Sequence, residues 1–450
     1  MLISHVKKGQ LFFLATFAAM IIGGTCLLAL PFGTPGENYP FINAVFMAVS
    51  SVCVTGLATN DICEFSFPGQ LIILLLVQLG AIGIMTLSAS ILLALGRGLS
   101  FSNTLMISGL NDNFSLRGVE NLTRIIIRYA LFCEGAGAVL IYIGLMFNDP
   151  AGNGFGVGEL LKPERYIINA WHAVFLGVSG FCNAGFSPVA GSLSKTNVLV
   201  QAVVALLVIL GGLGIYVIYD LREWVQKKRY FLRLHSKVVL STSAILLLVG
   251  MICVFVLSFD SGRPLSLFDA FCLSAFSRTA GFSALEGSAY FSPGVALVVI
   301  VLMLIGGAPG STAGGMKVTT AAVAFAAIRN TLQGNREVLI FKRSVSIEIV
   351  LRAFTMMVIF LLLFCIGGTV LHVLNPAGVP LLDTMFEAAS ALTTTGFSMG
   401  VTSKLTAGGK IFVIMLMIIG RLGPFSILLF LLSREKPGQL KYPAERVIIG

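Results

Sequence analysis

The sequence predicts an all-α polytopic membrane protein, built from four related units around one central path. Three observations support this. The 450 residues are 56% hydrophobic and only 11% charged, with a mean hydropathy of +0.94, whereas soluble domains are about 25% charged. Apolar runs that approach or reach the ~20 residues needed to cross a hydrocarbon core recur along the chain. A short motif that ends in glycine occurs four times between those runs.

Eight segments are predicted to span the membrane, and none contains more than one charged residue. They are Leu11–Leu30, Leu71–Leu95, Tyr129–Phe147, Val198–Tyr219, Val238–Phe259, Pro293–Ile305, Ala353–Leu374 and Ile411–Leu432. The first is too long for the apolar core of a typical signal peptide, and no convincing A-x-A site follows it. We therefore expect it to be retained.

Basic residues lie mainly at one end of these spans. Of the 30 Lys and Arg residues, 21 fall in the terminal segments and in the loops on the same side as both termini, against six on the other side. Because cytoplasmic loops carry the excess of Lys and Arg, both termini are expected in the cytoplasm. Topology thus accounts for the net charge of +10, and no nucleic-acid binding is expected.

The chain shows no pattern typical of an enzyme. Its eight cysteines contain no CxxC pair, and its four histidines lack the spacing of metal ligands. No P-loop or H-E-x-x-H motif occurs. A membrane enzyme that uses Glu134, His372 and Arg421 is the alternative of another class, but it lacks a nucleophile–base pair and leaves the four repeats unexplained.

Four glycines mark the repeated motif, and each follows a phenylalanine by ten residues. They are Gly56, Gly185, Gly281 and Gly396, after Phe46, Phe175, Phe271 and Phe386. Before each glycine runs an apolar half-span too short to cross the membrane: Phe41–Val52, Ile167–Val178, Ser266–Ser277 and Leu381–Leu392. Such a segment could re-enter the membrane or lie on it as a lid, and four copies at one place in each unit favour re-entry.

Each unit therefore has a span, a half-span, the glycine motif and a second span. The predicted boundaries are residues 1–98, 99–228, 229–340 and 341–450. All four half-spans start from the outer face, so each would return as an extended strand at membrane depth. Backbone of that kind is tolerated there only where it is buried or lines a wet cavity. Four such strands around one axis would form the narrow part of a pore.

The residues before the glycines share no carboxylate and no repeated ligand type, so their common feature is backbone. Glycine accepts a positive φ and can turn carbonyls toward one axis, and rings of carbonyls replace the hydration shell in potassium filters. The half-helix C-termini, each about −0.5 charge, favour cations in the cavity below. Packing glycines are the alternative, which the recurring Phe–Gly spacing disfavours. The predicted ion-binding carbonyls belong to Val54, Thr55, Gly56, Asn183, Ala184, Gly185, Thr279, Ala280, Gly281, Thr394, Thr395 and Gly396.

Two side chains in the motifs stand apart. Asn183 could orient the second strand by hydrogen bonding, or it could be a solvated residue of the mouth. Arg278 is a cation beside a cation path, so we expect it to point away from the axis and to pair with an outer acid, Glu64 or Glu286.

The third unit also contains an interrupted span. The segment 306–318 reads GGAPGSTAGGMKV, and Pro and Gly inside a helix cost about 3 and 1 kcal/mol. Below the filter such a loop would obstruct the path, so a gate is predicted, with a static kinked helix as the alternative. The predicted gating residues are Gly306, Gly307, Gly310, Gly314, Gly315, Lys317 and Arg421.

Arg421 lies in the middle of the last span, where an arginine costs about 2.5–3.5 kcal/mol and indicates function by default. A structural pairing with a carbonyl, or with an acid such as Glu134, is the alternative. Lys317 could pair with carbonyls of the loop or reach cytosolic water.

The motifs VTGLA, NAGFS, RTAGFS and TTGFS resemble those of the Trk/Ktr/HKT superfamily of potassium transporters, and the chain is most similar to its KtrB branch of TrkH-family membrane subunits. The resemblance covers nearly the whole chain. It implies four membrane–pore–membrane units with pseudo-fourfold symmetry in a bacterial cytoplasmic (inner) membrane. It also implies K⁺ as the transported ion, because all four filter positions are glycine here. A sodium-selective or Na⁺-coupled member is the alternative, although no dedicated sodium site is legible.

The resemblance also implies a gate and partners. In the family, the arginine that matches Arg421 lies under the filter and acts with the intramembrane loop as a barrier. The implied assembly is a homodimer in membrane lipids, bound to a cytosolic ring of nucleotide-binding RCK subunits of the KtrA/TrkA type, with the tail LKYPAERVIIG at the dimer contact. This chain has no G-x-G-x-x-G unit, so we expect it to bind no nucleotide itself.

Overall fold

The computed structural model of the chain describes residues 2–34, 36, 39–95, 116–147, 163–226, 230–259, 264–285, 291–335, 337–375 and 378–423. Across these ranges the fold is almost entirely helical, as predicted. The strands found there are β1 (Val338–Ile340) and β2 (Arg343–Val345), which pair as a short antiparallel hairpin. The C-terminal tail, expected at a dimer contact, lies outside the described residues.

The helices follow the predicted order of span, half-span and span. The first two units contain α1 (Leu2–Leu28), α2 (Phe41–Val52), α3 (Phe67–Leu95), α5 (Leu116–Met146), α7 (Pro163–Phe181), α8 (Val198–Gly212) and α9 (Ile215–Val225). The last two contain α10 (Leu234–Ser258), α11 (Leu267–Phe276), α12 (Pro293–Leu304), α13 (Val318–Leu332), α14 (Ile347–Leu374), α15 (Leu381–Thr393) and α16 (Ala407–Leu422). Short 3₁₀ turns, Ile62–Glu64 and Thr402–Lys404, follow the first and the fourth glycine motifs.

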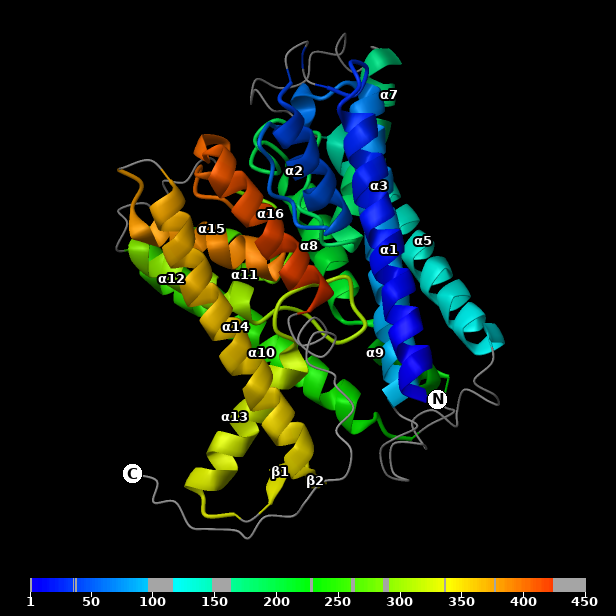
Figure 1. The fold of residues 1–450 in the computed structure, drawn as a ribbon, viewed down its shortest axis with the longest axis vertical. Coiled ribbons are helices and arrows are strands. Elements are labelled where there is room, and N and C mark those ends of the chain that lie inside the picture. The colour runs from blue at the N-terminus through cyan, green and yellow to red at the C-terminus, as the bar shows by residue number, and fades with distance from the viewer. Residues whose placement is uncertain are drawn as a thin grey trace.

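Local sequence explains where the half-helices begin. Pro40 and Pro380 precede α2 and α15. Proline is tolerated at the start of a helix but not in its interior, so both helices begin after these residues. Ser266 caps α11 in a reciprocal capping box with Asp269. In Figure 1, α2, α7, α11 and α15 lie away from the end of the molecule at which α1 begins, while α13 and the hairpin lie toward that end.

The four units are arranged in a closed cycle. Within the units, α2 packs against α1 and α3, α7 against α5 and α8, α11 against α10, and α15 against α14 and α16. Between units, α3 contacts α5 and α7, α11 contacts α8, α12 contacts α15, and α16 returns to α2. Each unit therefore touches the next, and the fourth touches the first.

Not every predicted span is a single straight helix. Among the described residues, three helices are long and apolar enough to cross a membrane: Thr123–Met146, Leu234–Ser258 and Ile347–Leu374. The segment Val198–Tyr219, predicted as one apolar span, is not a single helix, because α8 and α9 meet at a break with a bend of 96°. Gly214 has φ +80° at this break, a conformation that glycine allows.

Two other predicted spans differ from a single full-length helix. The segment predicted as Pro293–Ile305 forms the 12-residue α12 and then leaves helical geometry, in agreement with the expected interruption. The last predicted span begins earlier than expected, at Ala407, and its described part ends with α16 at Leu422.

Candidate ion filter and gate

The four glycines share an unusual backbone with the residues two positions before them. The φ angles of Gly56, Gly185, Gly281 and Gly396 are +93°, +73°, +65° and +96°. Val54, Asn183, Thr279 and Thr394 are also left-handed, with φ between +51° and +70°. Positive φ is a genuine outlier for β-branched residues, and strain of this kind clusters at functional sites.

The residue between each such pair does not have a positive φ. Left-handed and ordinary conformations therefore alternate along each strand. Such an alternation is compatible with successive carbonyls on one side of the strand, which is the arrangement that a ring of carbonyl ligands needs.

Close approaches between the glycines show that the four strands surround one axis. A methyl carbon built on Gly56 would collide with the carbonyl oxygen of Ala184, and one on Gly185 with that of Ala280. One on Gly281 would collide with that of Thr395. The series closes with Gly396, where the methyl carbon would collide with the carbonyl oxygen of Thr55.

Each glycine thus lies against the carbonyl that precedes the glycine of the next unit. At each of these four positions the ring has room for a hydrogen atom but not for a methyl group. The sequence therefore needs glycine there for two reasons, namely the positive φ and the approach of the neighbouring strand.

Hydrogen bonds fold each strand back onto its own half-helix. The backbone N–H groups of Thr55, Ala184 and Thr395 donate to Ser50 O, Ser179 O and Ser390 O, each at 2.8 Å. In the third unit the bond is displaced by one residue, because Ala280 N donates to Phe276 O at 3.0 Å. The half-helix C-termini are thereby held next to the strands, with their negative dipole ends toward the same region.

Asn183 orients the second strand, which decides between its two predicted roles. The residue is 1% exposed, so it is not a solvated mouth residue. When its amide nitrogen faces α7 and α8, that nitrogen donates to Gly180 O at 3.2 Å and to Val208 O at 3.1 Å. The side chain therefore ties the strand to two helices of its own unit.

The segment 306–318 forms an ordered loop with its own backbone hydrogen bonds. Gly306 N donates to Met316 O at 2.9 Å and Met316 N to Leu304 O at 3.2 Å, which joins the two ends of the loop. Ala308 N donates to Gly212 O at 2.9 Å. The loop is therefore held both to itself and to the break between α8 and α9.

The same loop lies against three of the four glycine strands. Thr312 Oγ1 donates to Phe181 O at 3.2 Å, at the start of the second strand. A methyl carbon on Gly314 would collide with Thr394 and lie 2.6 Å from Thr393 O, and one on Gly306 would lie 3.2 Å from Thr279 Cγ2. The loop thus lies next to the ends of the half-helices of units two and four and beside the third strand.

Two cations hold neighbouring carbonyls of the loop. Arg421, only 7% exposed, donates from Nη1 to Thr312 O at 2.6 Å. Its Nε and Nη2 are buried without a hydrogen-bond partner within the described residues. Lys317 donates from Nζ to Ala313 O at 2.6 Å, so it pairs with the loop, which is one of its two predicted alternatives.

The alternative partner of Arg421, Glu134, is occupied elsewhere. Both of its oxygens accept from Gln78 Nε2 at 3.0 Å. The thiol of Cys182 donates to Gln78 and to the same carboxylate, at 3.3 and 3.7 Å. The pairing of Arg421 is therefore with a loop carbonyl, a contact that both the gate and a static role would make.

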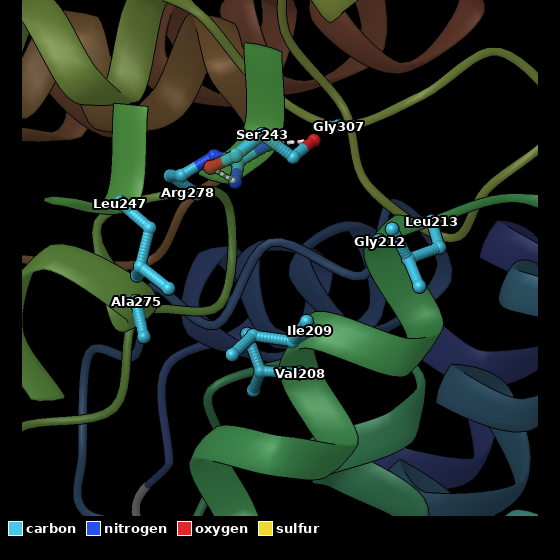
Figure 2. A pocket seen from close by; sticks show the side chains of 9 residues that line it. All are labelled: Val208, Ile209, Gly212, Leu213, Ser243, Leu247, Ala275, Arg278 and Gly307. Atoms are coloured by element: carbon cyan, nitrogen blue, oxygen red, sulfur yellow. Dashed lines mark hydrogen bonds between the residues drawn. The ribbon is translucent and has the colours of Figure 1, made fainter. Parts of the chain in front are cut away.

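Arg278 does not pair with Glu64, and that prediction is wrong. Its Nη1 donates to Ser243 O at 3.2 Å, and its Nη2 to Ser243 Oγ at 3.1 Å and to Gly306 O at 3.4 Å. Figure 2 shows Arg278 reaching Ser243 of α10, at one wall of a small pocket that Gly307 also lines. The guanidinium finds carbonyl and hydroxyl acceptors close by, and Glu64 accepts instead from Asn60. Glu286, the other expected partner, lies outside the described residues.

Two features of the site were missed from the sequence. Gly211 and Gly212 were not among the predicted gating residues, yet their carbonyl oxygens accept hydrogen bonds from the loop. Glu387, a fully buried acid in α15, was not singled out. Its signal was available, because it is an acid directly after a motif phenylalanine in a largely apolar half-helix.

Comparisons with known proteins agree on one family. The TrkH family, described as a cation transport protein, matches residues 7–437. The potassium/sodium uptake protein NtpJ of Enterococcus hirae is 34% identical, over 97% of this chain and 96% of its own. The Ktr system potassium uptake protein B of Vibrio alginolyticus is 32% identical, over 97% and 94%, and the protein of that name from Bacillus subtilis is 30% identical, over 96% and 95%.

A solved structure supports the fold. The potassium transporter TrkH from Vibrio parahaemolyticus superposes with a TM-score of 0.71, covering 95% of this chain and 85% of that one. The sequence identity is 18%.

Proposed function

Because the chain belongs to the TrkH family of cation transport proteins, we propose that it takes up potassium across the bacterial cytoplasmic membrane through the ring of four glycine strands. The observation that supports this best is the cyclic approach of each motif glycine to the carbonyl of the next unit. Family membership confirms that the protein is a multi-pass membrane transporter and not an enzyme.

The ion is proposed to shed its water at the carbonyls of Thr55, Ala184, Ala280 and Thr395 and of their neighbours in each strand. The ring of neutral dipoles suits an alkali cation, which needs several oxygen ligands and no fixed charge. The membrane potential would drive uptake, since moving one charge through 100 mV is worth about 2.3 kcal/mol.

The loop 306–318 is proposed to be the gate. Arg421 and Lys317 are proposed to be its latches, that is, side chains whose hydrogen bonds hold the loop closed. The hydrogen bonds to Thr312 O and Ala313 O support a closed position, because they hold the loop below the inner ends of the strands. A guanidinium there would also repel an approaching cation. Opening would require the loop to leave these bonds and the carbonyls of Gly211 and Gly212.

The partners remain proposals as well. We propose a homodimer with both termini in the cytoplasm, and a cytosolic ring of RCK-type subunits on the basic cytoplasmic face. Any regulatory nucleotide would then be bound by those subunits. The distribution of Lys and Arg along the sequence supports this orientation.

Sodium transport is the second candidate, because the name of the related NtpJ includes both ions. A hundredfold preference for potassium amounts to only about 2.7 kcal/mol, so a small change in the ring could decide between the two ions.

Uptake of ⁸⁶Rb⁺ into vesicles that contain the purified protein tests the proposal, with growth rescue of a strain that lacks potassium uptake as the cellular counterpart. We expect saturable ⁸⁶Rb⁺ uptake that excess K⁺ abolishes and that equal Na⁺ leaves nearly unchanged. Equal competition by the two ions would favour the sodium candidate, and the absence of uptake and of rescue would overturn the proposal.

A further inference from the structure

The fourth half-helix contains a buried carboxylate where the other three have apolar side chains. Glu387 follows the motif phenylalanine of α15, and the matching positions are Met47, Leu176 and Cys272. All four side chains are fully buried. Burying a carboxylate is costly unless hydrogen bonds satisfy it, so the fourth unit must contain something that the others lack.

The partners of Glu387 lie beyond the filter strand of its own unit. Ser398 Oγ donates to Oε2 at 2.9 Å, and Thr402 Oγ1 donates to Oε1. The hydroxyls of Thr402 and Ser398 are 3.0 Å apart, and Gly400 N donates to Ser398 Oγ at 3.0 Å. Ser398 is two residues after Gly396, so the carboxylate holds the outer end of the fourth strand against its half-helix.

The other units hold this segment differently. In the second unit, Ser187, the counterpart of Ser398, donates to Val189 O and Ser192 O of its own loop. In the third, Ser283 donates to Leu285 O. The second unit does have a link to its half-helix, from Ser179 Oγ to Phe186 O, but both groups are neutral. Bonds to a charged acceptor are about twice as strong as bonds between neutral groups.

We call the hydrogen bonds from Ser398 and Thr402 to Glu387 the clamp. A second contact, one turn further along α15, holds the filter glycine as well. Ser390 Oγ accepts from Gly396 N at 3.0 Å, and Ser390 O accepts from Thr395 N at 2.8 Å. The fourth strand is thus held by α15 both at its glycine and just beyond it. Thr395 O, against which Gly281 lies, is positioned by the same framework.

We propose that Glu387 is a positioning residue of the filter, which fixes the fourth strand through Ser398 and Thr402 and so sets the preference of the ring for potassium over sodium. A ring that cannot contract still reaches the larger K⁺ with its carbonyls but coordinates the smaller Na⁺ poorly. Fixing the strand therefore favours K⁺. This inference rests on the proposed function, because it assumes that the ring is the filter.

The central variant is Glu387→Gln, which keeps the size of the side chain and removes its charge. We expect the KM of ⁸⁶Rb⁺ uptake to rise about tenfold. The K⁺/Na⁺ ratio, which is the preference for K⁺ over Na⁺ as competitors of that uptake, should fall by a similar factor, and a tenfold change corresponds to about 1.4 kcal/mol. The maximal rate should stay within about twofold, since the gate is untouched.

The matched control is Asp383→Asn, which removes a carboxylate one turn earlier on the same half-helix. Asp383 lies in the first turn of α15, and within the described residues its carboxylate has no hydrogen bond to Ser398 or Thr402. Its KM and ion ratio should stay within about twofold of the wild type. Equal shifts in the two variants would overturn the proposal, because the effect would then come from charge alone.

A double-mutant cycle with Ser398→Ala separates positioning from general loss of structure. If Glu387 acts through Ser398, the two substitutions should be strongly non-additive in the K⁺/Na⁺ ratio. If Glu387→Gln does not fold, Ser398→Ala and Thr402→Val leave the charge in place and should each lower the ratio in the same direction. Additive effects, or wild-type ratios in all these variants, would overturn the inference, whereas failure of the wild type to take up ⁸⁶Rb⁺ would reject the proposed function itself.

Discussion

Replacing Arg421 by alanine tests the proposed gate at the hydrogen bond between α16 and the loop. The change removes the guanidinium that lies 2.6 Å from Thr312 O and leaves the backbone of α16 in place. Alanine also favours the helix more than arginine does, so helix propensity does not oppose the change. The expected result is faster potassium flux.

The size of the effect follows from that contact. A hydrogen bond from a charged donor contributes about 1.5–3 kcal/mol. If this bond is made only when the loop is closed, its loss shifts the loop toward the open position by a factor of roughly ten to a hundred. The gain in flux should approach that factor where the wild type is mostly closed, and should be smaller where opening is already common.

The assay is the initial rate of ⁸⁶Rb⁺ uptake into vesicles at equal amounts of folded protein. Arg329→Ala is the matched control, because it removes an exposed cation from the last turn of α13 and leaves the contact with Thr312 intact. Arg421→Lys keeps the charge and should give an intermediate rate. Unchanged or lower flux in a folded Arg421→Ala protein would refute the reasoning.

Three further predictions concern the ring, the second latch and the break. Gly56→Ser introduces a side chain at φ +93° against the next strand, and competition assays should show a lower K⁺/Na⁺ ratio; an unaltered ratio would contradict this. Lys317→Met removes the bond to Ala313 O and should raise ⁸⁶Rb⁺ flux, although less than Arg421→Ala; a fall would argue against a latch. Gly214→Ala brings a methyl carbon to 2.7 Å from Pro309 O at φ +80°, and thermal unfolding should report a loss of about 1–2 kcal/mol; unchanged stability would show that the break tolerates a side chain.

Much of the fold could be predicted because its signals are local and repeated. Apolar runs give the helices, and the common Phe–Gly spacing gives the half-helices, of which α2 matches its predicted bounds. The bend between α8 and α9 could not be predicted in the same way. The segment Val198–Tyr219 is uniformly apolar, and its glycines are of a kind that also lets helices pack closely. The loop of the third unit, which bonds to Gly211 O and Gly212 O, gives these glycines a role that the segment alone does not indicate.

The site divides along the same line. The four glycines and the interrupted helix are visible in the sequence, because backbone demands select glycine wherever they occur. The side-chain partners are not visible, since they depend on which helices meet. Arg278 was expected to need an acid, yet Ser243 and Gly306 O serve it. Glu387 depends on Ser398, eleven residues later, only because the strand folds back along α15.

The most direct measurement is a crystal structure of the protein grown in rubidium or thallium salts, with the ion located by its anomalous scattering. We expect ions on the axis of the ring, coordinated by the carbonyl oxygens of Thr55, Ala184, Ala280 and Thr395 and of the neighbouring residues of each strand. Ions found elsewhere, with none at these carbonyls, would contradict the claim that the four glycine strands form the filter.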